Sequence, residues 1–316
     1  MPKVENVGRA RTFRSGRAII ATLLCLLYLF PVVWMLATAF KPREEIISVP
    51  PKVFFSPTLE GFVALFYQRS TMTKMQQKRM EAQVDQLSWP ERVALKSGLK
   101  IIGPSQYVAR LKNSLIIAGG STIAALVLGV LAAYAFSRFP VVAKGDWMFF
   151  ILSTRMLPPV VVTIPIFLMY RYLGLFDTHI GMIILYTAFN LSLSVWLLNG
   201  FIDEIPREYE EAALVDGYSR WQAFIKIVLP QSVTGIAATA VFCLIFAWNE
   251  YAFALMLTGD RARTAPPSIP SVVGTAGREW AATAAGSLLF LIPVVIVAFG
   301  LRKYLLRGIT FGAIRG

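Results

Sequence analysis

The sequence predicts an all-α integral membrane protein with six transmembrane helices, and its composition, segment lengths and loop charges lead to that prediction. Hydrophobic residues make up 56% of the 316 residues and the mean hydropathy is +0.60, outside the range of an ordinary soluble domain. A helix needs about 20 apolar residues to cross the hydrocarbon core of a bilayer. Six segments reach that length: Ala18–Phe40, Leu111–Phe136, Trp147–Tyr170, Ile180–Phe201, Leu229–Thr258 and Ala281–Leu301.

Basic residues in the short loops predict that both termini lie in the cytoplasm. With the N-terminus inside, the cytoplasmic tails and loops carry fourteen Lys and Arg, whereas the short outer loops carry four. The first span is too long, and too lacking in a small-residue cleavage site, to be a removed signal peptide. The net charge of +13 is spread over loops and tails, where topology and anionic lipid headgroups explain it, so we expect no nucleic acid partner.

Cys25 and Cys243 both fall inside predicted spans, so they are expected to be small buried hydrophobes with no disulfide or metal framework. Gly119-Gly120, and Gly129 with Ala132 and Ala133, supply small faces for close helix contact.

The spans divide the chain into five parts. These are a basic tail (1–17), the first span (18–40), a long outer loop (41–110), a core of five further spans (111–301) with a cytoplasmic loop at 202–228, and a second tail (302–316).

The long outer loop contains a helical extension at about 68–107. The polar stretch Thr71–Leu87 favours a helix, and Ser88-Trp89-Pro90-Glu91 is typical of the capped start of a second one. Two interpretations stay open. The extension is either a solvated helical hairpin packed on the outer face or a docking surface for a partner. Residues 68–107 carry seven basic and three acidic side chains, a balance that would attract an acidic partner.

The polar segment between the fourth and fifth spans predicts a helix, a turn and a second helix at the membrane surface. Pro206 suits a first helical turn, and the glutamates that follow place negative charge where the helix dipole favours it. Gly217 is a natural C-terminal stop with positive φ. Ser219 with Gln222 is typical of a capping box. An ordinary helix lying on lipid is the weaker interpretation, because interfacial helices favour Lys and Arg over glutamates.

This segment resembles the EAA loop of permease subunits in ATP-binding cassette importers. Further stretches, at 41–57, 174–178 and 307–313, are similar to the maltose-type carbohydrate branch of that family. The resemblance covers nearly the whole chain except about 68–107, with departures at Tyr218 and Thr234. The residues at the spacings of the EAA pattern are Glu211, Ala212, Ala213, Asp216, Gly217, Phe224, Ile227, Leu229 and Pro230.

The resemblance implies a permease subunit of a binding-protein-dependent, ATP-driven importer of a sugar, polyol or small glycoside. It implies a bacterial inner membrane, a second homologous permease, two ATPase subunits that bind ATP and Mg, and a periplasmic binding protein. We expect that the chain itself is not an enzyme and holds no cofactor, since it lacks the phosphate-binding loop G-x-x-x-x-G-K-[ST] that an ATPase would need. The ATPase-coupling residues would be Glu210, Glu211, Ala212, Ala213, Asp216, Gly217 and Tyr218.

An ion-coupled secondary transporter or channel subunit is the alternative function. Such proteins usually show chains of buried acids or broken helices in repeated halves, and this sequence has Glu250 and little else. No catalytic constellation or metal cluster is visible. The lone histidine, His179, at the edge of an outer loop, is expected to be a surface residue.

Several polar residues within the spans are candidates for the translocation pathway. Arg155 and Glu250 are ionisable and costly in lipid, so each either borders the pathway or anchors the partner permease. They lie at different depths, so we expect no direct pair between them. The prolines at 158 and 159 imply a break in the third span. The pathway candidates are Arg155, Asn190, Trp248, Asn249 and Glu250.

The outer loop from Gly259 to Trp280 resembles the loop that reaches into the binding protein in maltose-type importers. Prolines stiffen such a loop, and glycines let its backbone pass close to a partner. A short ordered re-entry loop is the other interpretation. The binding-protein contacts would be Thr264, Pro266, Pro267, Gly274 and Gly277.

Overall fold

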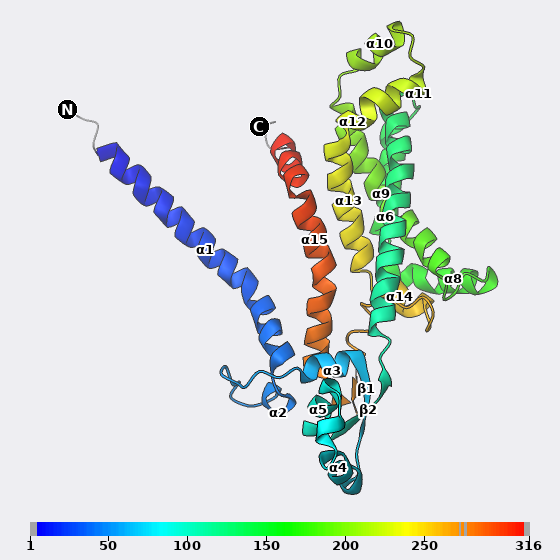
Figure 1. The fold of residues 1–316 in the computed structure, drawn as a ribbon. Coiled ribbons are helices and arrows are strands. Elements are labelled where there is room, and N and C mark those ends of the chain that lie inside the picture. The colour runs from blue at the N-terminus through cyan, green and yellow to red at the C-terminus, as the bar shows by residue number, and fades with distance from the viewer. Residues whose placement is uncertain (1–4, 272, 275–276, 313–316) are drawn as a thin grey trace. The chain divides into compact units, whose positions relative to one another are not determined.

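The computed structural model describes residues 5–271, 273–274 and 277–312, and most of this chain is helical (Figure 1). It forms two compact units. The extension unit comprises the chain up to Ser105 together with the segment that ends at Leu289, and the bundle unit comprises Gln106–Ser271 with the chain after Leu289. Each unit has its own packed residues.

In the described part of the chain, four helices are long and apolar enough to cross a membrane, and the count rises to six if each of two bent helix pairs is one span. The four are α1 (Glu5–Phe40), α6 (Tyr107–Arg138), α9 (His179–Asp203) and α15 (Trp280–Gly312). They contain the first, second, fourth and sixth predicted spans. Helix α1 begins within the basic tail rather than at the first apolar residue.

The third predicted span is broken, as its prolines indicated. Helix α7 (Lys144–Ser153) continues into the 3₁₀ turn η2 (Thr154–Met156). Helix α8 (Pro159–Tyr172) then leaves at 89° to the first part. A proline at 158 and another at 159 exclude the helical conformation before each of them, which accounts for the break.

The fifth predicted span is not the single helix expected over Leu229–Thr258. A bend of 71° separates the segment Arg220–Gln231 from α13 (Val233–Trp248), and residues 249–251 separate α13 from α14 (Ala252–Leu257). Before the bend, the chain forms α11 (Arg220–Ala223), the π-helical turn η3 (Phe224–Val228) and α12 (Leu229–Gln231). Pro230 lacks the N–H that a continuous helix would use, and Glu250 bonds to backbone N–H groups that follow it.

The bundle unit is built on α6, α9 and α13, which pack side by side (Figure 1). Small residues bring the first two together, as predicted for Gly120 and Gly129, whereas Gly119 has open space around it. A Cβ added at Gly129 would lie 2.1 Å from Ser194 Oγ, so only glycine fits that crossing. Cys243 is buried as expected, whereas Cys25 is exposed on α1.

The extension is not all-α, which corrects the fold prediction. Its ends pair as an antiparallel ladder of β1 (Tyr67–Thr71) and β2 (Leu99–Pro104), with a bulge at Gln68/Arg69. No tight turn joins these strands, because two helices lie between them, and the sequence therefore carries no hairpin signal. The other elements of this unit are α2 (Arg43–Ile46), α3 (Glu60–Phe66), α4 (Lys74–Glu81), η1 (Val84–Gln86), α5 (Trp89–Lys96) and the short strands β3 (Val273–Gly274) and β4 (Gly277–Arg278).

Of the two helices predicted in the extension, α5 begins where its sequence indicated, whereas the helix favoured over Thr71–Leu87 is shorter: Thr71 belongs to β1, and α4 covers only Lys74–Glu81. Ser88 and Glu91 form the predicted capping box of α5, and hydrogen bonding to Ser88 holds the pKa of Glu91 below its ordinary value. The extension shares a small core with α3, in which Val63 of α3, Ala94 of α5 and Leu99 of β2 are buried together. A folded insertion with a core is therefore present, rather than two solvated helices.

Gly61 of α3 fills a narrow gap between the ends of α1 and α15. A Cβ at this position would lie 2.6 Å from the carbonyl oxygen of Ala39 and 2.8 Å from that of Ala281. Both contacts are with backbone, which cannot rotate away as a side chain could. Any larger residue at Gly61 would therefore force the helices apart.

Candidate functional site

The loop that resembles the EAA segment forms α10 (Glu208–Val215), a turn at Gly217 and α11, at the end of the bundle opposite α14 (Figure 1). Gly217 has a φ of +88°, as predicted, and the N–H of Tyr218 donates to Ala213 O at 3.0 Å to close the helix end. The capping box of Ser219 with Gln222 is confirmed. Pro206 precedes the helix instead of lying in its first turn.

Glu210 anchors α10 to the end of α6. Its carboxylate forms an ion pair with Arg138 and accepts a hydrogen bond from the Tyr134 hydroxyl at 3.0 Å. The Arg138 guanidinium also donates to Ile205 O at 2.9 Å, and Arg207 donates to Ser137 O at 2.6 Å. Glu210 is only 7% exposed, so it supports the loop from within and offers no surface to a partner. The sequence did not separate its role from that of Glu211.

The outward face of this loop is a mixture of acidic and apolar side chains. Val215 is 87% exposed and Trp221 is 60% exposed, values unusual for such large apolar residues in a well-packed loop. Of the predicted coupling residues, only Glu210 and Ala213 are buried. Glu211, Ala212, Asp216, Gly217 and Tyr218 are exposed together with Tyr209.

A cavity of about 280 Å³ lies in the bundle unit where the two broken segments face α9. It brings together Arg155 from η2, Asn190 from α9 and Glu250 from the break after α13, three of the five predicted pathway residues. Trp248 and Asn249 do not line it. The Trp248 indole is buried and donates to Phe290 O at 3.1 Å, and Asn249 is exposed and bonds to Ile245 O.

The two ionisable residues of this cavity differ in how they are partnered. No ion pair joins them, but both line one cavity, whereas the sequence placed them at different depths. The Glu250 carboxylate accepts hydrogen bonds from the Tyr186 hydroxyl at 2.6 Å and from the N–H groups of Phe253 and Ala254 at 2.8 and 3.0 Å. The guanidinium carbon of Arg155 lies 4.0 Å from the centre of the Phe246 ring. Arg155 Nη1 is buried and has no hydrogen-bond partner among the residues that the structure describes.

Asp177 organises the start of the loop that follows α14. Its carboxylate accepts hydrogen bonds from the N–H groups of Gly259, Arg261 and Ala262 at 2.8, 3.2 and 2.9 Å. Burial alone would raise the pKa of Asp177, but the three N–H donors and the charge of Arg261 outweigh it and lower that pKa below 3.8. The sequence contained no signal for this role.

The same loop is held from α6 by the Asn-Ser pair at positions 113 and 114. Asn113 Nδ2 donates to Arg261 O and Arg263 O at 2.8 and 3.0 Å, and Ser114 Oγ accepts from Ala265 N at 2.9 Å. His179 is only half-exposed, because its Nε2 lies 2.8 Å from Asn113 Oδ1. This corrects the expectation of a surface histidine, and gives it a structural partner.

The predicted binding-protein contacts fall into two groups. Thr264 is 3% exposed and Pro267 is also buried, so these two face the bundle unit, and Pro266 is half-buried. Gly274 and Gly277 pair with each other across β3 and β4, while residues 275–276 lie outside the described chain. The contact with a binding protein stays a prediction.

An ion-pair cluster in the extension unit was missed by the sequence. The Arg69 guanidinium of β1 lies 3.2 Å from a Glu279 oxygen and 3.7 Å from Glu60, and Arg43 of α2 lies 3.3 Å from the same Glu279 carboxylate. Arg69 was counted with the basic surface of the extension, but its side chain is only 6% exposed. It is a buried structural charge.

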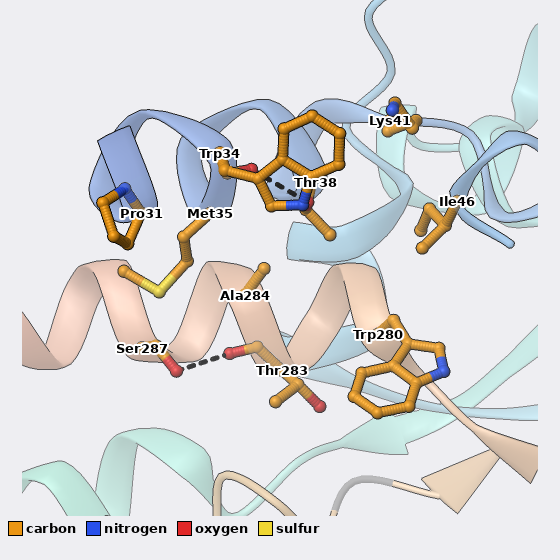
Figure 2. Close-up of a pocket in the computed structure, with 10 residues that line it drawn as sticks. All are labelled: Pro31, Trp34, Met35, Thr38, Lys41, Ile46, Trp280, Thr283, Ala284 and Ser287. Atoms are coloured by element: carbon orange, nitrogen blue, oxygen red, sulfur yellow. Dashed lines mark hydrogen bonds between the residues drawn. The ribbon is translucent and has the colours of Figure 1, made fainter. Parts of the chain in front are cut away.

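A second cavity, of about 320 Å³, lies between α1 and the start of α15 (Figure 2). Pro31, Trp34 and Met35 face it from α1, and Thr283 and Ser287 face it from α15. The Lys41 ammonium at its edge lies 5.2 Å from the Trp34 ring centre and donates to Lys52 O at 2.6 Å. Its cation is already engaged within the chain.

Comparison with known proteins places these features in a family. The model of the family described as "Binding-protein-dependent transport system inner membrane component" matches residues 125–311. A probable ABC transporter permease of Sinorhizobium fredii is 32% identical over 312 residues, which cover 97% of this chain and 99% of that protein. The trehalose/maltose transport system permease protein MalG of Thermococcus litoralis is 32% identical over 94% of this chain and 95% of its own length.

The fold agrees with a solved transporter. A chain in the crystal structure of a bacterial ABC transporter involved in the import of the acidic polysaccharide alginate superposes with a TM-score of 0.65. That likeness covers 93% of this chain and 96% of the other, at 20% sequence identity, and it concerns the fold alone. The chain belongs to the family of inner membrane components of binding-protein-dependent transport systems, and is a permease.

Proposed function

We propose that this chain is one of two permease subunits in an ATP-driven importer of a sugar, polyol or small glycoside. Two ATPase subunits inside the cell and a binding protein outside would complete the importer. The trehalose/maltose permease and a permease for diacetylchitobiose uptake are among the relatives that support the substrate class. In this proposal the chain spans a bacterial inner membrane six times, each bent helix pair counts as one span, and both termini are cytoplasmic.

One observation carries the coupling part of this proposal. The α10–α11 loop is held rigidly from within by Glu210, yet it exposes Val215 and Trp221, two large apolar side chains. A rigid apolar surface edged by carboxylates is suited to a protein partner rather than to solvent. We infer that α10 inserts into a cleft on an ATPase subunit, so closure of the ATPases would move the loop and the bundle behind it.

The test is uptake of maltose and trehalose into vesicles that contain this chain with its second permease, ATPases and binding protein. Wild type is expected to accumulate sugar only when ATP is present on the side of the vesicle membrane that carries the ATPases and binding protein is present on the opposite side. Gly217→Asp and Glu211→Lys are expected to insert normally and to abolish uptake while hydrolysis persists. A φ of +88° resists any residue with a Cβ, and Glu211 is exposed on α10.

Matched controls separate the loop from general effects of charge. Gly145→Asp places a carboxylate at an exposed helical glycine with open space around it, and Glu204→Lys reverses a charge before α10 begins. Both are expected to transport like wild type. Wild-type uptake by the two loop variants would disprove the coupling role, and uptake driven by an ion gradient without ATPases would support a secondary transporter instead.

A further inference from the structure

The 280 Å³ cavity of the bundle unit is lined by two interruptions of helical structure. Arg155 comes from the 3₁₀ turn between α7 and α8, and Glu250 comes from the three-residue break between α13 and α14. Within a membrane, irregular backbone is tolerated where it is buried in protein or lines a water-filled cavity. In transporters, broken helices of this kind commonly mark the place where a substrate binds.

The walls of this cavity combine aromatic faces with few polar groups. Phe189, Phe246 and Phe253 contribute rings, with Phe189 and Phe253 4.9 Å apart between centres, and Asn190 adds an amide. Ligand sites generally have this composition, with apolar walls and a small number of placed donors. A saccharide ring offers an apolar face to an aromatic ring and hydroxyl groups at its edge, so it fits such walls.

The two charged groups of the cavity do not form an ion pair with each other. Glu250 has both oxygens occupied by Tyr186, Phe253 and Ala254, so it fixes the start of α14. Arg155 rests on Phe246, and its buried Nη1 has no acceptor. A buried donor without a partner costs free energy, and a guanidinium is suited to two neighbouring oxygen atoms. Arg155 is therefore available as a hydrogen-bond donor to a ligand.

We propose that this cavity is a saccharide subsite of the permease, in which Arg155 donates to a pair of neighbouring oxygens of the sugar while Phe246 holds the guanidinium in place. The inference rests on the proposed function, because it names the contact that this subunit makes with the transported sugar. Paired oxygens occur as adjacent hydroxyls in a neutral sugar and as a carboxylate in a uronic acid. Both supply the acceptors that Nη1 lacks.

Saturation-transfer NMR of the assembled, detergent-purified importer tests the subsite directly. The probes are maltose, glucose, glucuronate and glucuronamide, the last of which replaces the carboxylate of glucuronate with a neutral amide. In the wild type, saturation is expected to transfer to at least one probe, and Arg155→Gln is expected to weaken the binding of that probe at least about tenfold, the lower end of the loss for a hydrogen bond from a charged donor. Arg155→Lys keeps the charge but loses the planar pair of donors, so it is expected to restore only part of the binding.

The matched control is Arg171→Gln. Arg171 also stacks on aromatic rings, with its guanidinium carbon 5.3 Å from the Phe176 ring centre, but it is exposed and lies outside the cavity. Its substitution is expected to leave all four signals unchanged. A glucuronate signal well above that of glucuronamide would assign the acceptor as a carboxylate, whereas equal signals would assign it as hydroxyls.

Two results would overturn the inference. One is the absence of saturation for all four probes, and the other is saturation that Arg155→Gln leaves unaltered. These failures differ from failure of the proposed function, which is read from ATP-dependent uptake in vesicles. An importer that accumulates maltose normally but whose NMR signals Arg155→Gln leaves unaltered would keep its function and lose this subsite.

Discussion

The Arg69 guanidinium lies 3.2 Å from the Glu279 carboxylate, and each side chain is only 6% exposed. This ion pair joins β1 of the extension to the residue that directly precedes α15. Arg43 and Glu60 complete the cluster from α2 and α3. The extension is therefore tied by buried charge to the chain that leads from the β3–β4 hairpin into the last helix.

Removing one partner of this pair is expected to destabilise the extension unit strongly. Arg69→Ala leaves Glu279 with less compensation in a buried position, a change that typically costs about 3–5 kcal/mol. Lys52→Ala is the control, because it breaks an exposed pair with Glu45 that is worth at most about 1 kcal/mol. Limited proteolysis within residues 67–104 measures the difference. Equal cleavage rates for both variants would mean that the cluster contributes little.

Glu210 and Glu211 are adjacent in sequence but are expected to respond differently to substitution. Glu210→Gln weakens the charge-assisted bonds to Arg138 and Tyr134, so the amides of 208–223 should exchange hydrogen faster. Glu211→Gln should leave that exchange unchanged because its side chain is exposed. Hydrogen exchange with mass spectrometry reports both, and faster exchange in Glu211→Gln alone would reverse the assignment of roles.

Asp177 is expected to make the loop at 259–263 sensitive to acid. Its folded-state pKa lies below the ordinary 3.8, so the group stabilises the loop fully above that ordinary value. This contribution is lost as pH falls through the lowered folded-state pKa. Asp177→Asn keeps the shape and tolerates the φ of +55°, but removes the charge. Exchange of amides 259–262 between neutral and acid pH should vary more in wild type, and identical profiles would exclude this role.

The exposed basic residues of α4 are expected to affect the rate at which an acidic binding protein associates. Lys74, Lys78 and Arg79 are all exposed, so their replacement by serine should slow association at low salt. At high salt the difference should vanish, because the Debye length falls to about 3 Å at 1 M. Surface plasmon resonance with the cognate binding protein measures this. Equal association rates at low salt would leave the extension with a packing role only.

In the proposed importer, we expect the β3–β4 hairpin to be the part of the outer loop that contacts the binding protein, since Thr264 and Pro267 are buried. Exchanging residues 274–277 for a Ser-Asn-Gly-Ser turn keeps the length and alters the surface. ATPase stimulation by the binding protein is expected to fall at least severalfold, with basal hydrolysis retained. Pro266→Ala, which changes a half-buried residue before the hairpin, serves as the control. Full stimulation in the exchanged variant would move the contact elsewhere.

Much of the fold could be predicted from sequence because apolar length, proline and glycine act locally. The positive φ of Gly217, the capping boxes at Ser88 and Ser219 and the break at Pro158 each follow from a few neighbouring residues. The four long helices follow from hydropathy alone. Such signals need no knowledge of which segments meet in space.

The features that were missed depend on contacts between residues far apart in the chain. The pairing of Thr71 with Leu99 closes a ladder around two inserted helices, and neither strand has a turn that would reveal it. Arg69 was read as a surface charge because its partner, Glu279, lies on a distant segment. The inward direction of Glu210 was likewise set by Arg138 of another helix. The sequence shows which type of residue stands at each of these positions, but their partners, and so their roles, follow only from packing.

The close fit of Gly61 against Ala39 and Ala281 has a consequence for the order in which the protein is made. Ala39 and Gly61 leave the ribosome early, whereas Ala281 is translated near the end of the chain. During most of synthesis, only the Ala39 wall of this gap is therefore present. Helix α3 cannot reach its final packing until Ala281, at the start of the last helix, has been made. Completion of this unit would thus report that synthesis has reached the start of the last helix.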